Sequence, residues 1–215
     1  DSKHGDLKGA ENTYPYMLLE QRPGWAVESI CQRYLTMTRV LDLLLADPDL
    51  AVGADVVLHI GLNDCADRMF LEHERIALGL LPDELKDSIV RFAQQHRRDI
   101  LAHLPGHHYV PPTEFTATVD TILSILASRA RRVVVATIIL PPIRFWPATP
   151  GLQANFGRYN LALMDAAARH GALVFDVDRH MWANQNEGVL QSDGMHLDTA
   201  GHEIFAEEAA ALLAK

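Results

Sequence analysis

Asp193 and His196 stand three residues apart in an Asp-Gly-Met-His stretch near the C-terminal end of the chain. A histidine that takes a proton from a nucleophile needs a carboxylate to fix its tautomer and stabilise its cation. Two other segments carry groups suited to the same chemistry: Ser2 offers a hydroxyl, and Asn63 offers a side-chain amide after an apolar run. A nucleophile, an oxyanion donor and an acid–histidine pair together make an acyl-transfer site.

Composition excludes several classes of function. The chain has 215 residues, 48% of them hydrophobic, and a formal net charge of −9. This acidic balance argues against nucleic acid or an anionic membrane as a main partner, because both need a basic surface. No apolar run approaches the roughly 18 residues of a transmembrane helix. Cys31 and Cys65 are too few for a disulfide framework and are expected to be buried free thiols.

The chain begins at Asp1 rather than at a methionine, which indicates trimming or processing. A signal peptide would have been lost with the missing residues, so the compartment stays open and cytoplasmic is only the default. The oligomeric state is open as well.

Short apolar runs alternate with longer amphipathic segments along the chain. Strands are expected at residues 25–30, 54–60, 132–140 and 172–176. Helices are expected at residues 14–21, 38–46, 82–103, 113–130, 152–170 and 199–214. Thr113 is a candidate N-cap of the helix at 113–130, with Glu114 in its first turn. Gly171 is the expected C-terminal stop of the helix at 152–170.

This alternation predicts an α/β fold with a parallel sheet and helices on both faces, a three-layer α/β/α sandwich. We expect one domain over residues 1–215. In such a sheet, active residues lie on loops at the carboxyl ends of the strands. Asn63 follows one predicted strand at that edge, and the loop at residues 141–150 follows another.

The motifs, in their order, resemble those of the SGNH or GDSL hydrolase family. Asp1-Ser2 matches the end of the Gly-Asp-Ser block, and Thr13-Tyr14-Pro15 is similar to the start of the first helix in many members. Gly61, Asn63 and Asp64 match Gly-x-Asn-Asp, Asp193 and His196 match Asp-x-x-His, and residues 197–201 (LDTAG) follow the family's Leu-Asn-x-x-Gly with Asp198 in place of asparagine. The resemblance covers nearly the whole chain and implies the flavodoxin-like SGNH fold.

The resemblance also implies roles that agree with the chemistry. Ser2 is the expected nucleophile, His196 the base and later the acid, and Asp193 the group that orients His196. The Ser2 amide and the Asn63 side chain are the expected oxyanion donors. An ionised Asp64 carboxylate can accept hydrogen bonds but cannot donate them. We therefore expect Asp64 to support the loop from Gly61 rather than to be an oxyanion donor.

The sequence departs from the family pattern in two places. The family's opening strand, which precedes Gly-Asp-Ser and is central to the sheet, is absent, so we expect residues upstream of Asp1. The glycine of the family's second block, whose N–H is a third oxyanion donor, falls by spacing at Arg33 or Tyr34. The backbone N–H of Arg33 is the candidate donor, since the change of residue type retains that group.

Three further residues are candidates for lining the substrate pocket. Arg68 is suited to meet a carboxylate or a sugar hydroxyl, Phe70 to hold an acyl chain, and Trp146 to stack on a sugar ring. For Arg68 and Phe70 a plain loop entering a helix is the favoured interpretation, and for Trp146 a hydrophobic plug is an equal alternative.

No cofactor and no metal is expected. His103, His107 and His108 cluster in a Gly/Pro-containing segment, but no carboxylate stands at ligand spacing, so a solvated loop is the favoured interpretation. A lid near the active edge is the intermediate possibility.

The leading hypothesis for function is a serine ester hydrolase that acts on a small or carbohydrate-linked O-acyl ester. An O-acyltransferase that passes the acyl group to a glycan with the same residues is the first alternative. A catalytically impaired member that binds a carbohydrate or a partner is the second, because the second block is altered. A small-molecule or glycan ester is thus the expected ligand.

Overall fold

The computed structural model describes residues 9–104, 107–183 and 189–214. Within these residues, three parallel strands form a sheet in the order β1-β2-β3. They are β1 (Asp55–His59), β2 (Arg132–Ala136) and β3 (Leu173–Phe175). In the register Val57 pairs with Val134 on one side of β2, and Val174 pairs with Val135 on the other. All three are short β-branched or apolar runs, as expected for strands covered on both faces.

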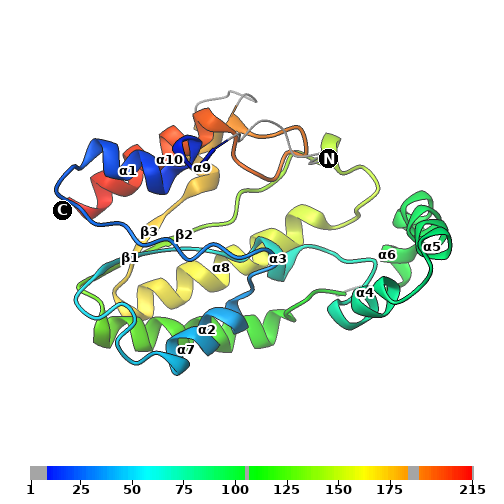
Figure 1. The fold of residues 1–215 in the computed structure, drawn as a ribbon, viewed down its shortest axis with the longest axis horizontal. Helices are drawn as coiled ribbons and strands as arrows, with labels where there is room; N and C mark the ends of the chain where they lie inside the picture. The colour runs from blue at the N-terminus through cyan, green and yellow to red at the C-terminus, as the bar shows by residue number, and fades with distance from the viewer. Residues whose placement is uncertain (1–8, 105–106, 184–188, 215) are drawn as a thin grey trace.

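Helices cover both faces of the sheet, so the fold is the predicted α/β/α sandwich (Figure 1). One layer consists of α1 (Tyr14–Gln21), α9 (Val177–Ala183) and α10 (Thr199–Leu213). The other consists of α2 (Met37–Ala46), α7 (Pro112–Arg129) and α8 (Leu152–His170). In the described part of the chain, no helix is both long enough and apolar enough to cross a membrane.

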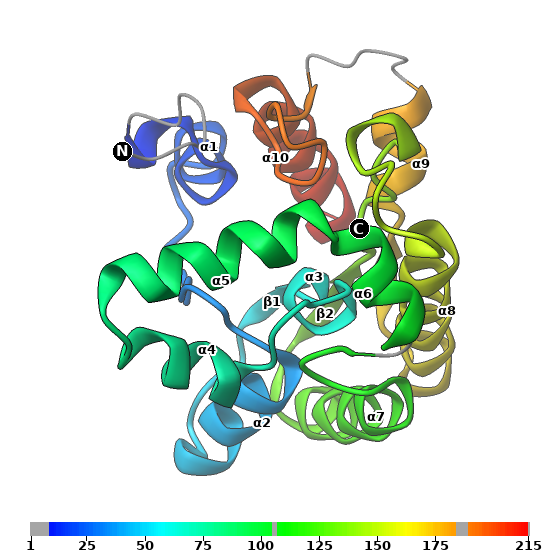
Figure 2. The same cartoon turned by 90° about the vertical axis from the view of Figure 1, so that its right-hand side faces the viewer.

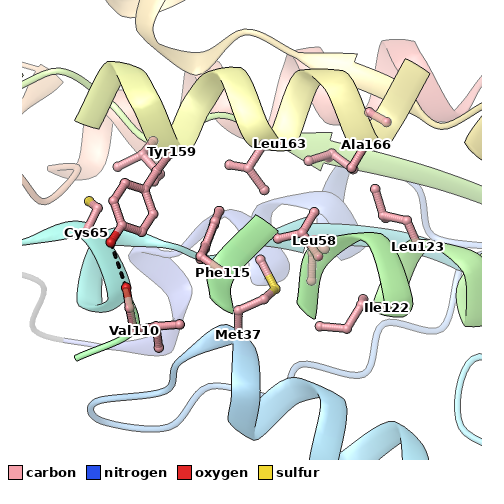
Figure 3. Close-up of a cluster of buried hydrophobic side chains, with 14 of the residues drawn as sticks. Met37, Leu58, Cys65, Val110, Phe115, Ile122, Leu123, Tyr159, Leu163 and Ala166 are labelled. Atoms are coloured by element: carbon pink, nitrogen blue, oxygen red, sulfur yellow. Dashed lines mark hydrogen bonds between the residues drawn. The ribbon is translucent and has the colours of Figure 1, made fainter. Parts of the chain in front are cut away.

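Each face of the sheet has its own hydrophobic core, because successive strand residues point to opposite faces. Val133 and Val135 face the α2, α7 and α8 layer, whereas Val134 and Ala136 face the α1 and α10 layer. The first of these cores is drawn in Figure 3, where the Tyr159 hydroxyl donates to the Val110 carbonyl across 2.6 Å.

Most predicted elements are confirmed within a residue or two. The helix at residues 14–21 is α1, and the helix at 152–170 is α8, which ends at Gly171 with φ of 68°. The strands at 54–60 and 172–176 are present as the slightly shorter β1 and β3. The helices at 38–46 and 199–214 are α2 and α10.

The strand predicted at residues 25–30 is wrong. This segment has no regular secondary structure and lies outside the sheet, and of its residues only Trp25 and Val27 pack on the α1 and α10 core. The apolar side chains of this run cover the edge of a hydrophobic core, and its backbone is not paired with a strand of the described residues.

The strand predicted at residues 132–140 is too long, since β2 ends at Ala136. The Thr137 N–H still donates to the carbonyl of Phe175 in β3, but from Ile138 onward side chains provide the hydrogen-bond partners of the backbone. Asn160 both accepts from the Ile138 N–H and donates to the Ile138 carbonyl, each at 2.7 Å, and Asp178 accepts from the Leu140 N–H. The apolar run continues because the segment stays buried, not because it stays paired.

The single helix predicted at residues 82–103 is also wrong. It is two helices, α5 (Asp83–Gln95) and α6 (Arg97–His103), separated at His96, where φ is −105° and ψ is 19°. The predicted N-cap Thr113 lies inside α7, whose first residue is Pro112. The prediction missed α3 (Leu62–Cys65), α4 (Glu72–Gly79), α9 and the short 3-10 helices η1 (Ala10–Asn12) and η2 (Ile143–Phe145).

The helices α4, α5 and α6 lie beyond the carboxyl ends of the strands, on the right of Figure 1. Figure 2 looks onto that edge, and there α3 is seen below α5 and beside α6. Since α3 begins directly after β1 and contains Asn63, the α4–α6 segment covers the edge at which chemistry was expected.

Candidate active site

Asp193 and His196 form a hydrogen-bonded pair. His196 Nδ1 lies 2.6 Å from Asp193 Oδ2, and Asp193 Oδ1 accepts from the backbone N–H groups of Met195 and His196 at 2.9 and 3.1 Å. The Asp193 side chain is mostly buried, whereas that of His196 is 52% exposed. The arrangement holds the ring by one nitrogen and presents it at the surface, as a general base requires.

The pair shifts the pKa of both members. Burial alone would raise the pKa of Asp193, but hydrogen bonds from the His196 ring and from the two backbone N–H groups outweigh it and lower the pKa to about 2. The hydrogen bond to Asp193 raises the pKa of His196, with partial burial opposing it. Asp193 is therefore ionised at neutral pH and stabilises the imidazolium that a proton transfer creates.

Short-range contacts shape the loop around this pair. Gly194 has φ of 68°, and a Cβ there would lie 2.6 Å from the Phe145 ring, so a larger residue is excluded by both conformation and space. Gln191 N–H donates to the His196 carbonyl, and an antiparallel bridge joins Leu190 to Leu197.

The helix that follows the pair is capped by the residue that departs from the family motif. Asp198 Oδ1 accepts from the Gly201 N–H at 2.9 Å as N-cap of α10. Asp and Asn cap helices about equally well, so the replacement retains the function of the position. A Cβ on Gly201 would lie 2.3 Å from the Val189 carbonyl oxygen, which explains the glycine.

Asn63 lies in the first turn after β1. Gly61 has φ of 124°, and a Cβ there would lie 2.6 Å from Ile138 Cδ1, so the turn into α3 requires glycine. The Asn63 side-chain NH₂ donates to the Leu35 carbonyl at 3.0 Å, and its Oδ1 accepts from Arg68 at 3.2 Å. These two bonds fix the orientation of the amide, which keeps a second N–H for another acceptor.

Asp64 joins the same turn to α2. Its Oδ1 accepts from the Met37 N–H at 2.8 Å, while its Oδ2 is buried and has no hydrogen-bond partner in the structure. Burial raises the pKa of Asp64 to about 6, against the effect of this hydrogen bond. This geometry fits the supporting role predicted for Asp64.

The segment between Gln32 and Leu35 is a tight turn, in which the Leu35 N–H donates to the Gln32 carbonyl at 3.2 Å. Its third residue, Tyr34, has φ of 61°, a conformation that favours glycine. Of the two positions at which the family's glycine falls by spacing, Tyr34 thus has a backbone conformation typical of glycine, and Arg33, the predicted donor, is the residue before it.

The predicted substrate-lining residues are placed as follows. Arg68 is half-buried and donates to both the carbonyl and the side-chain oxygen of Asn63. Phe70 is half-buried in the loop before α4. Trp146 Nε1–H donates to the Asp193 carbonyl at 2.7 Å, so this ring contacts the acid–histidine loop.

Arg97, which the sequence did not single out, connects the two sides of the site. From the start of α6 it donates to the Asp67 carbonyl at 3.1 Å and to Thr149 Oγ1 at 2.9 Å. Its guanidinium carbon lies 5.6 Å from the centre of the Trp146 ring. The loop after Asn63 is thereby joined to the residue that holds Asp193. A helix surface arginine has no sequence signal that distinguishes this role.

The solvated loop predicted for His103, His107 and His108 is confirmed at His103, which is exposed, but is wrong at His108. His108 is buried, with Nδ1 3.7 Å from Asp67 Oδ1, and His107 Nδ1 lies 2.9 Å from the Arg68 carbonyl. The His107 carbonyl accepts from the Arg68 N–H, so this part of the segment lies against the turn that leaves α3. Among the described residues, no three His, Cys, Asp or Glu side chains are gathered as a metal ion would require. Of the two thiols, Cys65 is buried as predicted but Cys31 is exposed.

A family model of GDSL-like lipases and acylhydrolases matches residues 8–204. The chain belongs to this family. It is therefore a member of a family of carboxylic-ester hydrolases, as its motifs predicted. Among curated proteins, no sequence matches this GDSL-like chain significantly.

Solved structures of similar fold cover nearly the whole GDSL-like chain. A member of the lipolytic G-D-S-L family from Veillonella parvula has a TM-score of 0.63 at 12% identity, over 98% of this chain and 92% of that one. An acetyl xylan esterase has a TM-score of 0.63 at 13% identity, over 94% and 91%. An α/β hydrolase from the metagenome of Lake Arreo, Spain, has 0.60 at 20% identity, over 98% and 84%. At these identities the likeness concerns the fold.

Ser2, the expected nucleophile of this GDSL-like hydrolase, lies outside the described residues. Tyr14, the first residue of α1, packs on the helix that follows the acid–histidine loop. The Tyr14 N–H donates to His202 Nδ1 at 3.3 Å, and the Tyr14 ring stacks on Phe205 at 4.2 Å. Both partners belong to α10, the helix that begins just after His196.

Proposed function

We propose that this GDSL-like hydrolase is a serine esterase that acts through an acyl-enzyme on a small or carbohydrate-linked O-acyl ester. The observation that carries the proposal is the 2.6 Å contact of Asp193 with His196 Nδ1, on a ring that is half exposed. A carboxylate at Nδ1 holds the neutral ring with its proton on that nitrogen, so Nε2 has the lone pair of a base.

In the proposed mechanism, Ser2 Oγ attacks the acyl carbon while His196 Nε2 accepts the hydroxyl proton. The tetrahedral intermediate then collapses, the bond to the leaving alkoxide breaks, and the alcohol departs with the proton from His196. A water molecule attacks the acyl-enzyme with His196 again as the base, and the acid leaves as Ser2 is restored.

The second N–H of Asn63 and the backbone N–H groups of Ser2 and Tyr34 are the proposed donors to the oxyanion. Each such donor contributes about 3–4 kcal/mol to the stabilisation of the transition state. The glycine-like φ of Tyr34 supports a donor at this position of the turn rather than at Arg33. The fixed amide of Asn63 supports its role, because pre-oriented donors need no reorganisation during the reaction.

Two observations support an ester linked to a sugar as the substrate. An acetyl xylan esterase shares the fold, and aromatic and cationic side chains lie at the active edge, among them Trp146 and Arg68. A short O-acetyl ester is accordingly the first substrate to test.

The test is labelling of the full chain with a fluorophosphonate probe, followed by mapping of the modified residue and by assay of acetate release from acetylated sugars. We expect labelling at Ser2 that vanishes in Ser2→Ala and persists in the matched control Ser29→Ala, at an exposed position. No labelling of a folded chain would overturn the proposal in favour of a binding protein. Capture of the acetyl group by an added glycan, in preference to water, would make the chain an O-acyltransferase.

A further inference from the structure

Five side chains form a continuous stack of alternating arginine and tyrosine beside the predicted oxyanion donors. The guanidinium carbon of Arg33 lies 5.1 Å from the centre of the Tyr34 ring, and that of Arg75 lies 3.8 Å from the same point. The guanidinium carbon of Arg75 also lies 5.9 Å from the centre of the Tyr109 ring. That of Arg68 lies 4.5 Å from the centre of the Tyr109 ring. We call these residues the arginine–tyrosine stack.

The stack draws on segments far apart in the sequence and ends at the candidate site. Tyr34 provides the glycine-like turn, Arg75 comes from α4, and Tyr109 follows the α6 helix. At its inner end Arg68 donates to the side-chain oxygen of Asn63 at 3.2 Å. Its outer end, at Arg33, is exposed. The stack therefore runs from the predicted oxyanion donor to the surface.

Stacking uses the faces of the guanidinium groups and leaves their N–H donors at the edges. Within the described chain, none of the three arginines has a carboxylate at ion-pair distance. The neighbouring acids on α4 are used elsewhere, since Glu72 pairs with Arg39 and Glu74 accepts from the Leu71 N–H that caps the helix.

The Arg68 side chain adds a second, independent observation that favours an anionic ligand. Its Nε is buried and has no hydrogen-bond partner in the structure. A buried charged donor without an acceptor is costly, and an anion bound next to it would remove that cost. Three cations gathered without acids are also unexpected in a chain of net charge −9, where acids outnumber bases by 28 to 19.

We propose that the arginine–tyrosine stack is a substrate subsite for an anionic group, so that the preferred substrate is an O-acyl ester that carries a carboxylate. The planar N–H edges of arginine match a carboxylate, and the tyrosine rings between them hold the guanidinium groups in place. This inference rests on the proposed esterase function. The carboxylate belongs either to the acyl part or to the alcohol part of the ester.

The experiment compares kcat/KM for two matched pairs of esters with the full chain. For the alcohol part, para-acetoxybenzoate is compared with the neutral para-acetoxybenzamide. For the acyl part, mono-para-nitrophenyl succinate is compared with its methyl ester. We expect the anionic ester to be preferred by about tenfold in one pair, which identifies the part that carries the charge. Added salt should reduce that preference, because it screens exposed charges.

Three variants test the origin of the preference. Arg75→Gln should reduce the ratio of anionic to neutral kcat/KM by about five- to tenfold, and Arg33→Gln, at an exposed position, should reduce it by less. The matched control is Arg39→Gln, which loses the same charge from the neighbouring helix and should leave the ratio unchanged. Thermal melting establishes that each variant is folded, and Arg33→Gln serves if Arg75→Gln is not.

The possible failures are distinguishable. Turnover of the neutral esters with no preference for either anion, or a preference that survives both Arg33→Gln and Arg75→Gln, overturns the subsite and leaves the esterase function intact. Absence of turnover with all four esters, together with no fluorophosphonate labelling, overturns the esterase function and with it the subsite.

Discussion

The two sides of the candidate site are organised in different ways. The acid–histidine side is built by contacts within one short loop: Asp193 bonds Met195 and His196, and Gln191 bonds the His196 carbonyl. The donor side is built across the fold. Asn63 donates to the Leu35 carbonyl, just before α2, and Asp64 accepts from the N–H of Met37, the first residue of α2.

This difference teaches which side is sensitive to the rest of the molecule. A loop that satisfies its own hydrogen bonds keeps its geometry wherever it is attached. A donor turn that depends on other segments keeps its geometry only if those segments are in place. Arg97 and Trp146 are the exception on the acid–histidine side. Together they connect the Asp193 carbonyl to the turn after α3.

The largest expected effect is that of Asp193→Asn, which removes the charge that holds His196. We expect kcat to fall by about 10³- to 10⁴-fold, because an amide no longer fixes the tautomer. Since the hydrogen bond to Asp193 raises the pKa of His196, the acid limb of the pH–rate profile should move to lower pH in the variant. Steady-state kinetics across pH on an aryl acetate would measure both. The control Asp198→Asn retains the helix cap, and an equal loss there would refute the assignment.

Asn63→Ala tests the donor side directly. Loss of one oxyanion donor should lower kcat by about 10²- to 10³-fold with little change in KM, because the interaction is made in the transition state. The same variant leaves the Leu35 carbonyl without its donor, so urea unfolding must accompany the kinetics. A rise in KM with an unchanged kcat would show that Asn63 binds the ground state instead.

Asp64→Asn tests how the donor turn depends on α2. Because burial raises the pKa of Asp64 from 3.8 to about 6, the folded protein binds the proton more tightly than the unfolded chain. This contribution to stability is complete below the lower value and is lost as the pH rises through about 6. We expect the wild-type free energy of unfolding to lose about 2–3 kcal/mol over this window, and the variant to lack that loss.

Urea unfolding at several pH values between about 4 and 7 would measure the effect of Asp64→Asn. The control is Asp42→Asn, at an exposed position of α2. Parallel pH profiles for the wild type and Asp64→Asn would mean that Asp64 does not titrate with folding.

Trp146→Phe has the smallest expected effect and tests the exception on the acid–histidine side. Phenylalanine retains an aromatic ring for Arg97 to stack on, and only the 2.7 Å hydrogen bond from Nε1 to the Asp193 carbonyl is lost. Since one such bond contributes about 1 kcal/mol, we expect kcat to fall by about fivefold. Trp25→Phe, on the other core, is the matched control. An unchanged kcat would mean that the loop holds Asp193 without help from the fold.

Sequence patterns predicted the layers of the fold because each depends on local periodicity. The β-branched runs that became β1 and β2, and the capped amphipathic helix α8, needed no knowledge of their partners. The run at residues 25–30 has the same local character and is not a strand, since no strand of the described residues pairs with it. Local pattern specifies an extended backbone, and tertiary contact decides whether it is paired.

The acid–histidine pair of Asp193 and His196 was determined by the sequence itself, because three residues of spacing are enough to bring the two side chains within hydrogen-bonding distance. Only the tertiary structure decided the environment of Asn63, the burial of Asp64 and His108, the connection through Arg97, and the gathering of Arg33, Arg68 and Arg75 around two tyrosines. The physical reason is range. Hydrogen bonds within a loop follow from the order of its residues, whereas burial, stacking and the pKa shifts that they cause depend on which distant segments the fold places next to one another.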